Sequence, residues 1–293
     1  AILVLVLSLL TGCSKGNETV STGKDSDADD KTYNLKLATV VSAPHPWINM
    51  AEYFSEEVEK RTDGKVKIAV HDSGTLGKDE TTIDEMRNGT IDIVLGGTQN
   101  VAAFVPEYQV FGLSYLFDDV EQFERIIGKD SPVFQRFKEL YDEKDIGLKL
   151  LALSYGGVRN ASNNKKPIET PDDLKGMKMR LPGSPMESKL WSELGAIPTS
   201  LSWNELYSAI QTGVVNTFES TVSGYKGAKL YEGAAYHSQT EQLYMVSHVT
   251  MSKLTYDKLP EEYVKIIEEV AIEASERIDP LILDKNSRIL SFS

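Results

Sequence analysis

The sequence has very little cysteine and relatively few basic residues. Cys13 is its single cysteine, so no disulfide can form within the chain. Lysine and arginine number 31 against 44 aspartate and glutamate residues, which gives a net charge of −13. Because nucleic acid is bound by a basic face, this balance argues against a nucleic-acid partner. Salt screens the negative field over about 8–10 Å, so local arginines can still form an anion site.

Motifs of catalysis and of cofactor binding are missing as well. No G-x-G-x-x-G or P-loop pattern occurs, so the sequence gives no sign of a nucleotide site. No Gly-x-Ser-x-Gly occurs, and none of the four histidines has the spacing of a metal ligand: His45, His71, His237 and His248. We therefore expect no metal, no cofactor and no enzymatic activity.

The N-terminal segment has no apolar run long enough to span a bilayer. Residues 1–10 are apolar and lead into Leu10-Thr11-Gly12-Cys13, which resembles the signal box of a lipoprotein. We expect residues 1–13 to belong to a signal peptide whose start precedes this sequence, and Cys13 to carry a lipid anchor outside the cytoplasm. The alternative is a buried cysteine after an apolar strand. Residues 14–32 hold one sizeable apolar residue, Val20, which predicts a flexible tether of about 20–25 Å.

Strand and helix patterns alternate from Tyr33 onwards, which predicts an α/β fold with a parallel, doubly wound sheet. A buried apolar strand over 148–155 ends at Gly156-Gly157, and a strand over 243–250 follows later in the chain. The pattern is helical from Pro260 onwards. The other predicted strands cover 33–41, 65–70 and 91–95, and the predicted helices cover 48–62, 79–88, 120–127 and 132–143.

One stretch, residues 176–221, carries the clearest sign of a ligand site. Met177, Met179 and Leu181 alternate with polar residues as in a half-buried strand, and a helix over 203–212 begins behind Ser202 as its N-cap. Arg180 stands at the end of that strand, where α/β folds collect ligand contacts and where a guanidinium can bind a carboxylate or phosphate. The alternative is a surface arginine in an ordinary ion pair.

The same stretch resembles a known family. Met179-Arg-Leu-Pro, Trp203-Asn-Glu-Leu-Tyr-Ser-Ala-Ile-Gln-Thr-Gly-Val-Val and Phe218-Glu219 are similar to the signature of TRAP-transporter solute-binding proteins, the family of the C4-dicarboxylate-binding protein. The resemblance covers roughly residues 35–260. It implies a two-lobed fold of the periplasmic-binding-protein type, with doubly wound sheets and a cleft between the lobes. Lobe I would comprise residues 33–156 and 246–260, lobe II residues 157–245, and a long hinge-spanning helical segment residues 261–293, which appear truncated at the C-terminus.

The resemblance also implies which residues bind the ligand. Arg180 corresponds to the family's carboxylate-binding arginine, and Arg159 to a second arginine in the cleft. Two such cations would need an anionic ligand, since an unpaired buried charge is costly; the alternative is that each pairs with a protein acid such as Glu219. Trp203 would pack on the ligand, with a core tryptophan at a helix start as its alternative. Ser220, next to Glu219, replaces an asparagine that contacts ligand in many members.

Residues of two other loops complete the expected site. His45 belongs to a loop rich in proline after the first strand. Thr98 follows Gly96-Gly97, whose glycines permit close approach of backbone to a ligand, although a plain tight turn explains them equally well. Some binders of acidic sugars carry an acid at the position of Gly97, so a ligand that relies on this acid is disfavoured.

The resemblance implies a monomeric extracytoplasmic receptor, in the periplasm or on the outer face of the cytoplasmic membrane. It would bind a small organic acid, such as a C4-dicarboxylate or a sugar acid, and deliver it to TRAP membrane subunits. A binding protein for an ABC importer or a sensor kinase is the main alternative, and a purely structural lipoprotein is another. The sequence does not name the acid, although Trp203 and the small Ser220 slightly favour one bulkier than succinate.

Overall fold

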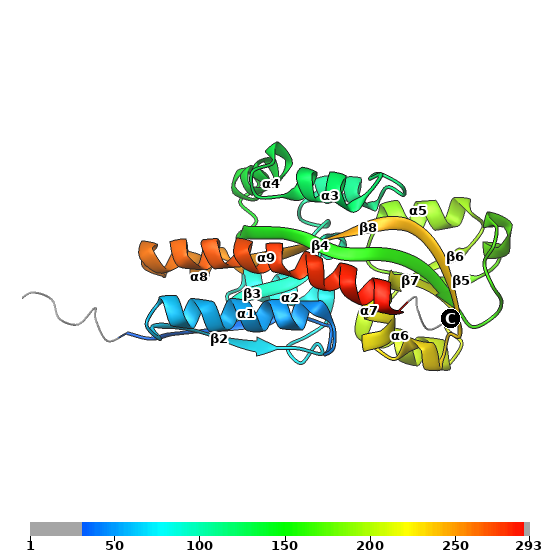
Figure 1. Ribbon diagram of the computed structural model, residues 1–293, viewed down its shortest axis with the longest axis horizontal. Coiled ribbons are helices and arrows are strands. Elements are labelled where there is room, and N and C mark those ends of the chain that lie inside the picture. The colour runs from blue at the N-terminus through cyan, green and yellow to red at the C-terminus, as the bar shows by residue number, and fades with distance from the viewer. Residues whose placement is uncertain (1–30, 290–293) are drawn as a thin grey trace, which may run out of the picture. The chain divides into compact units, whose positions relative to one another are not determined.

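The computed structural model describes residues 31–289, and the strands in this range form one mixed sheet of eight strands (Figure 1). The order across the sheet is β2-β1-β3-β8-β4-β7-β5-β6. The predicted signal segment with Cys13, and nearly all of the predicted tether, lie outside the described residues. The strands are β1 (Tyr33–Ala38), β2 (Val66–His71), β3 (Ile93–Gly97), β4 (Leu148–Asn163), β5 (Lys178–Leu181), β6 (Ile197–Ser200), β7 (Thr217–Thr221) and β8 (Tyr236–Ser252).

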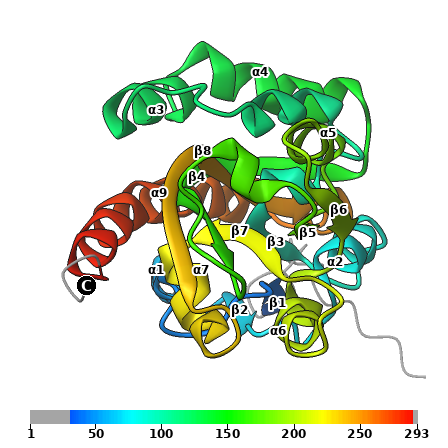
Figure 2. The same cartoon turned by 90° about the vertical axis from the view of Figure 1, so that its right-hand side faces the viewer.

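Strands β4 and β8 are much longer than the sequence predicts. They have 16 and 17 residues and pair antiparallel over most of their length, so they run side by side through the whole sheet (Figure 2). The prediction that β4 ends at Tyr155 is wrong, because Gly156 and Gly157 form an irregularity in the ladder instead of a strand end. Gly157 has a φ of +107°, which only glycine adopts readily. As a result, the predicted α/β fold has one continuous sheet in place of two.

Two parallel sets of strands flank the β4–β8 pair. β1 is parallel to β2 and β3 on one side, and β5 is parallel to β6 and β7 on the other. In the register, Gly97 at the end of β3 is opposite Ser247 of β8, and Thr221 at the end of β7 is opposite Arg159 of β4. The carboxyl ends of both parallel sets therefore converge on the middle of the long pair, which is where open α/β sheets bind ligands.

The predicted helices over 120–127 and 132–143 are confirmed, and each begins with a side-chain cap. Asp119 accepts a hydrogen bond from the backbone N–H of Gln122, and Ser131 from that of Phe134. The α-helices are α1 (Pro46–Arg61), α2 (Asp79–Arg87), α3 (Val120–Ile127), α4 (Pro132–Glu143), α5 (Pro185–Glu193), α6 (Trp203–Gln211), α7 (Val222–Gly227), α8 (Lys253–Tyr256) and α9 (Glu261–Ile289), and the 3-10 helices are η1 (Thr98–Asn100), η2 (Pro106–Gly112), η3 (Pro171–Leu174) and η4 (Leu230–Glu232).

Helix α9 confirms the long C-terminal helix and packs against β4 and α1 (Figure 1). Within residues 31–289, no helix combines the length and the apolar character needed to cross a membrane. From Thr32 onwards the chain forms one compact unit, and the division into two lobes stays a prediction.

Buried apolar side chains form three clusters around the sheet. The largest joins β1, β3, β4 and β8 to α1, α3, α4 and α9, and it includes an aromatic group around Phe123 and Tyr155, whose ring centroids are 5.1 Å apart. Two smaller clusters lie under α5 and under α6. The carboxyl ends of β5 and β7 are therefore held by cores separate from the one that holds β3, which leaves room for a cavity where these ends converge.

Gly156 should be sensitive to substitution because a Cβ atom there would lie 2.9 Å from the carbonyl oxygen of Met245. We expect Gly156→Ala to lower the free energy of unfolding by about 1–3 kcal/mol, since the β4–β8 ladder must shift to accept the methyl group. Gly183→Ala is the matched control, because no atom lies within 4 Å of its added methyl group. Urea denaturation of both variants measures the difference, and equal stabilities would show that the ladder absorbs the methyl group freely.

Candidate functional site

A cavity lies where the carboxyl ends of the strands converge. Its lining includes Gly97 at the end of β3, Arg159 of β4, Arg180 of β5 and Ser220 of β7. It encloses about 500 Å³ free of protein atoms, part of which is open to solvent. Five of the predicted residues line it: Arg159, Arg180, Trp203, Ser220 and His45.

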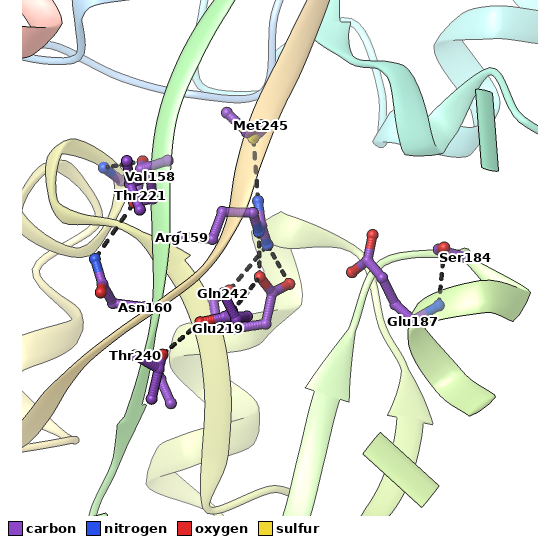
Figure 3. Close-up of polar contacts among 12 residues, drawn as sticks. Val158, Arg159, Asn160, Ser184, Glu187, Glu219, Thr221, Thr240, Gln242 and Met245 are labelled. Atoms are coloured by element: carbon purple, nitrogen blue, oxygen red, sulfur yellow. Dashed lines mark hydrogen bonds and ion pairs between the residues drawn. The ribbon is translucent and has the colours of Figure 1, made fainter. Parts of the chain in front are cut away.

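Arg159 is paired with a protein acid. Its Nε and Nη2 donate to the two carboxylate oxygens of Glu219, and Nη2 also donates to the Glu219 carbonyl oxygen at 2.9 Å (Figure 3). Arg159 is 6% exposed and Glu219 1%, so the two charges compensate each other away from water. The structure thus shows the alternative stated for Arg159, in which it pairs with a protein acid and not with a ligand alone. Glu219, which was predicted to bind the ligand, does not line the cavity.

Arg180 has no such partner. Its Nε donates to the carbonyl oxygen of Leu201 at 2.8 Å, and its guanidinium carbon lies 5.7 Å from the ring centroid of Trp203. Within the side chains that the structure describes, residues 31–277, Arg180 forms no ion pair with a carboxylate. Burial at 2% exposure lowers its pKa below the ordinary arginine value, because removal from water disfavours the cation, although the charge of Asp79 acts in the opposite direction.

Asp79, at the start of α2, is a buried acid that lines the cavity. It was not predicted from the sequence. Its carboxylate accepts from Asn100 Nδ2 at 2.9 Å and from the backbone N–H of Trp203 at 3.5 Å. Burial raises its pKa to about 6, although the charges of Arg180 and Arg159 act in the opposite direction. An acid in the first turn of a helix is common, because it complements the helix dipole, so the sequence carries no signal of this role.

Three further polar atoms are buried at the cavity without a hydrogen-bond partner among the described residues. They are the indole Nε1 of Trp47, which the sequence also does not reveal, the side-chain oxygen Oε1 of Gln99 and the hydroxyl oxygen of Ser220. Such atoms normally have a partner, so a donor, an acceptor and a hydroxyl group are available to a bound molecule.

Of the two ligand-binding residues predicted in loops, His45 lines the cavity and Thr98 does not. His45 is 2% exposed and lines the cavity, and its Nδ1 accepts from the backbone N–H of Trp47 at 3.2 Å. Thr98 donates to the carbonyl oxygen of Val246 at 3.1 Å and does not line this cavity. Its neighbours Gln99 and Asn100 take that place, because the chain enters the 3-10 helix η1 at Thr98.

Ser202 occupies the N-cap position of α6, as the sequence predicts, but its side chain makes no capping hydrogen bond to the helix. Its hydroxyl donates to Glu80 at 3.1 Å, while Glu205 pairs with Lys78 at 2.6 Å. Both contacts join the start of α6 to the start of α2, next to the cavity. The polar residues at the start of α6 thus hold the two helices together.

A second, smaller cavity adjoins the first, and Gln99 borders both. Glu187 of α5 lines the second cavity at 2% exposure. Its backbone N–H donates to Ser184, but its carboxylate lies beside the Arg159–Glu219 pair without a hydrogen bond (Figure 3). Burial, and then the charge of Glu219, raise the pKa of Glu187 to about 8.

Glu187 should make stability depend on pH. Folding raises its pKa from 4.5 to about 8, so the stability associated with its protonated form is complete below about 4.5 and is lost as the pH rises through about 8. The unsubstituted protein should therefore lose stability between about pH 5 and about pH 9, and Glu187→Gln should not. We expect the free energy of unfolding of Glu187→Gln, relative to that of the unsubstituted protein, to rise by on the order of a few kcal/mol over this range. Urea unfolding at both pH values measures this gain.

Glu193→Gln is the control for that experiment, because Glu193 is an exposed acid on the same helix. It should show the same difference from the unsubstituted protein at both pH values. If Glu187→Gln behaves like Glu193→Gln, the carboxylate of Glu187 has a partner in solution and the assignment of an unpaired group is wrong.

Comparison with known proteins gives consistent matches over most of the chain. A solute-binding protein of Sulfitobacter sp. NAS-14.1 is 30% identical over 243 residues, which are 82% of this chain and 72% of the relative. The 2,3-diketo-L-gulonate-binding periplasmic protein YiaO of Escherichia coli is 29% identical over 240 residues, 82% of this chain and 72% of its own length.

Solved structures show the same fold. The sugar acid binding protein DctPAm of Advenella mimigardefordensis, in complex with galactonate, superposes with a TM-score of 0.85 at 26% identity and covers 89% of this chain and 83% of its own. A TRAP periplasmic solute-binding protein of Sulfurospirillum deleyianum with bound succinate gives 0.81 at 28% identity, covering 88% and 84%. These neighbours are transport proteins, not enzymes. The model of the DctP family, bacterial extracellular solute-binding proteins of family 7, matches residues 37–293, and the chain therefore belongs to this family of TRAP solute-binding proteins.

Proposed function

We propose that the cavity binds the carboxylate of a small organic acid and that Arg180 is the group that holds it. The observation that carries this proposal is a guanidinium that is 2% exposed, lines the cavity and has no carboxylate partner within residues 31–277. An unpaired buried cation is costly, and an anion that binds it removes that cost. A carboxylate also matches the planar geometry of the guanidinium group.

Arg159 contributes less charge than the resemblance implies. Because Glu219 already occupies its Nε and Nη2, Arg159 can support a ligand only through its remaining nitrogen, which contacts the sulfur of Met245 at 3.1 Å. The pair fixes the position of Arg159 at the cavity wall. Ser220 and Trp47 add a hydroxyl group and an N–H donor for other oxygens of the acid.

Relatives support an acid as the ligand. The structural neighbours include proteins solved with galactonate and with succinate, and one from Sulfitobacter sp. NAS-14.1 with β-D-galacturonate. Each of these ligands carries a carboxylate, which is the feature that they share. The receptor would pass the acid to the membrane subunits of a TRAP transporter, so an ABC importer or a sensor kinase has no support from these relatives.

Capture would involve closure of two lobes around the ligand. The cavity lining combines residues of the predicted lobe I, such as Asp79, with residues of the predicted lobe II, such as Arg180 and Trp203. The contacts between the starts of α2 and α6 link the same two parts. Closure of this kind is a hinge motion that a membrane partner can recognise. The receptor would act as a monomer, and a lipid at Cys13 would hold it outside the cytoplasm.

Arg180→Ala tests the site directly. The acid should bind about 30-fold to several thousandfold more weakly, because loss of one partner of a desolvated charge pair costs about 2–5 kcal/mol. A panel of organic acids and neutral sugars, screened by thermal melting, would first identify a ligand; at 100 times its Kd a ligand adds about 2.7 kcal/mol of stability. Calorimetry on both proteins then gives the affinities.

Arg125→Ala, on the exposed surface of α3, should leave the affinity unchanged. Binding by Arg180→Ala within about threefold of the unsubstituted protein would contradict the role of Arg180. Stabilisation by neutral sugars, and not by acids, would contradict an acid as the ligand.

A further inference from the structure

A third cavity adjoins the main one at Val40, Asp79 and Asn100, which line both. It encloses about 230 Å³ free of protein atoms, less than half of the corresponding space in the main cavity. Apolar side chains of α2 and β3 form much of its wall, together with Thr39 and His248. Because Arg180 does not line it, this cavity is distinct from the place where we expect the carboxylate of the solute.

Two side chains of the third cavity carry polar atoms that no described residue satisfies. They are Oγ1 of Thr39, directly after β1, and Nε2 of His248 in β8. Thr39 is 3% exposed and His248 is 0% exposed, so bulk solvent does not satisfy these atoms. Buried polar atoms in native proteins normally have a partner, and an ordered water molecule is the usual one where no protein group is available.

The hydrogen bonds on the other side of His248 determine which ring nitrogen carries its proton. Tyr108 donates to the hydroxyl oxygen of Tyr141 at 3.2 Å, so the proton of Tyr141 is available to Oγ1 of Thr250 at 3.4 Å. The hydroxyl group of Thr250 then donates to Nδ1 of His248 at 2.8 Å. Burial lowers the pKa of His248 to about 3, so the ring is neutral and its single proton is on Nε2. The cavity therefore has an N–H donor in its wall.

Asp79 provides the matching acceptor. Its carboxylate accepts from Asn100 at 2.9 Å and from the backbone N–H of Trp203 at 3.5 Å, which leaves capacity for a further donor. The cavity thus combines one N–H donor, one carboxylate and one hydroxyl group, which can donate or accept. A water molecule both donates and accepts, so it satisfies all three groups. A cation does not fit, because the proton on Nε2 of His248 would be directed at it.

We propose that the third cavity binds one ordered water molecule, which accepts from Nε2–H of His248, bonds to the hydroxyl group of Thr39 and donates to the carboxylate of Asp79. His248 is then a positioning residue, since it does not line the main cavity but holds an acid of that cavity through the water molecule. The inference does not depend on the proposed function, because it concerns the protein without a ligand.

A high-resolution crystal structure of the unsubstituted protein tests the site directly. We expect a water molecule within about 3.2 Å of both Nε2 of His248 and Oγ1 of Thr39. Nitrogen-15 NMR of the histidine ring should show His248 as the tautomer that is protonated at Nε2. An empty cavity, a metal ion in place of the water molecule, or the tautomer protonated at Nδ1 would each overturn the proposal.

Thr39→Val removes the hydroxyl group with almost no change in volume. If this group holds a water molecule, its loss should lower the Tm by about 2–4 °C. If the hydroxyl group has no partner, an apolar group of the same shape should leave the Tm unchanged or raise it, and either result would contradict the proposal. Ser252→Ala is the control, because Ser252 is also buried without a partner in the described part of the chain and lines none of the three cavities. We expect it to cause no loss.

The pKa of Asp79 reports the positioning role. Carbon-13 NMR follows its carboxyl group, whose signal is assigned by its loss in Asp79→Asn. We expect a higher pKa in His248→Leu, because the ionised carboxylate loses a hydrogen bond when the water molecule is no longer held. His248→Gln should largely restore the pKa, because its amide group can donate to the water molecule. Thr39→Val should raise the pKa as well, so the test does not depend on the folding of one variant.

The charges that act on Asp79 are the same in all these proteins. They belong to Glu80 on the same helix, Arg159 of β4 and Arg180 of β5. His237→Leu is the matched control, because His237 is also in β8 but lines neither the main nor the third cavity. It should leave the pKa of Asp79 unchanged. If His248→Leu and Thr39→Val also leave it unchanged, or if His248→Gln behaves like His248→Leu, the positioning role of His248 is wrong.

Discussion

The buried ion pair between Arg159 and Glu219 determines the charge of the whole site. The two residues lie on the adjacent strands β4 and β7, where Glu219 is two residues from Thr221, the register partner of Arg159. Their contact satisfies two charges that water cannot reach. One guanidinium is thereby withdrawn from ligand binding, and Arg180 is left as the cation that an anion can approach. A site that seems to offer two arginines in the sequence offers one in the structure.

The position of that pair depends in turn on the length of β4. If β4 ended at Gly156, as a glycine pair suggests, Arg159 would stand in a loop. The irregularity at Gly157 lets the strand continue, so the backbone of Arg159 is held between β7 and β8. Rigid strands hold a side chain more accurately than loops do, which explains how two charges can be buried with their hydrogen bonds satisfied. The same long pair joins the two parallel sets of strands whose ends form the cavity.

The sequence predicts well what depends on local pattern. Helices α3 and α4 have clear periodicity and capping residues at their starts, and the bounds predicted from the sequence agree with those in the structure. Arg180 could be placed at a cavity because a strand with a proline after it has a definite end. The partner of Arg159 stayed open between a ligand and Glu219, since the two residues are 60 positions apart and only the pairing of β4 with β7 brings them together.

Other parts of the site could not be predicted from the sequence. Asp79 and Glu187 each stand in the first turn of a helix, where acids are common for reasons unrelated to ligands. Their burial results from the packing of α2 and α5 around the converging strand ends. Thr98 and Gln99 are adjacent, and the turn into η1 decides which of them lines the cavity. Such a choice depends on tertiary structure, and sequence pattern alone carries no information about it.

The charges on the surface and those at the site act over different distances. The net charge of −13 resides mostly on exposed residues, whose field salt screens over about 8–10 Å. Arg180 is removed from water, so its attraction for a carboxylate is much less screened. Relatives of the same fold hold both succinate and galactonate. Since a carboxylate is common to both, the group that binds the carboxylate cannot by itself distinguish these two ligands, and selectivity in such a fold depends on the other groups of the site.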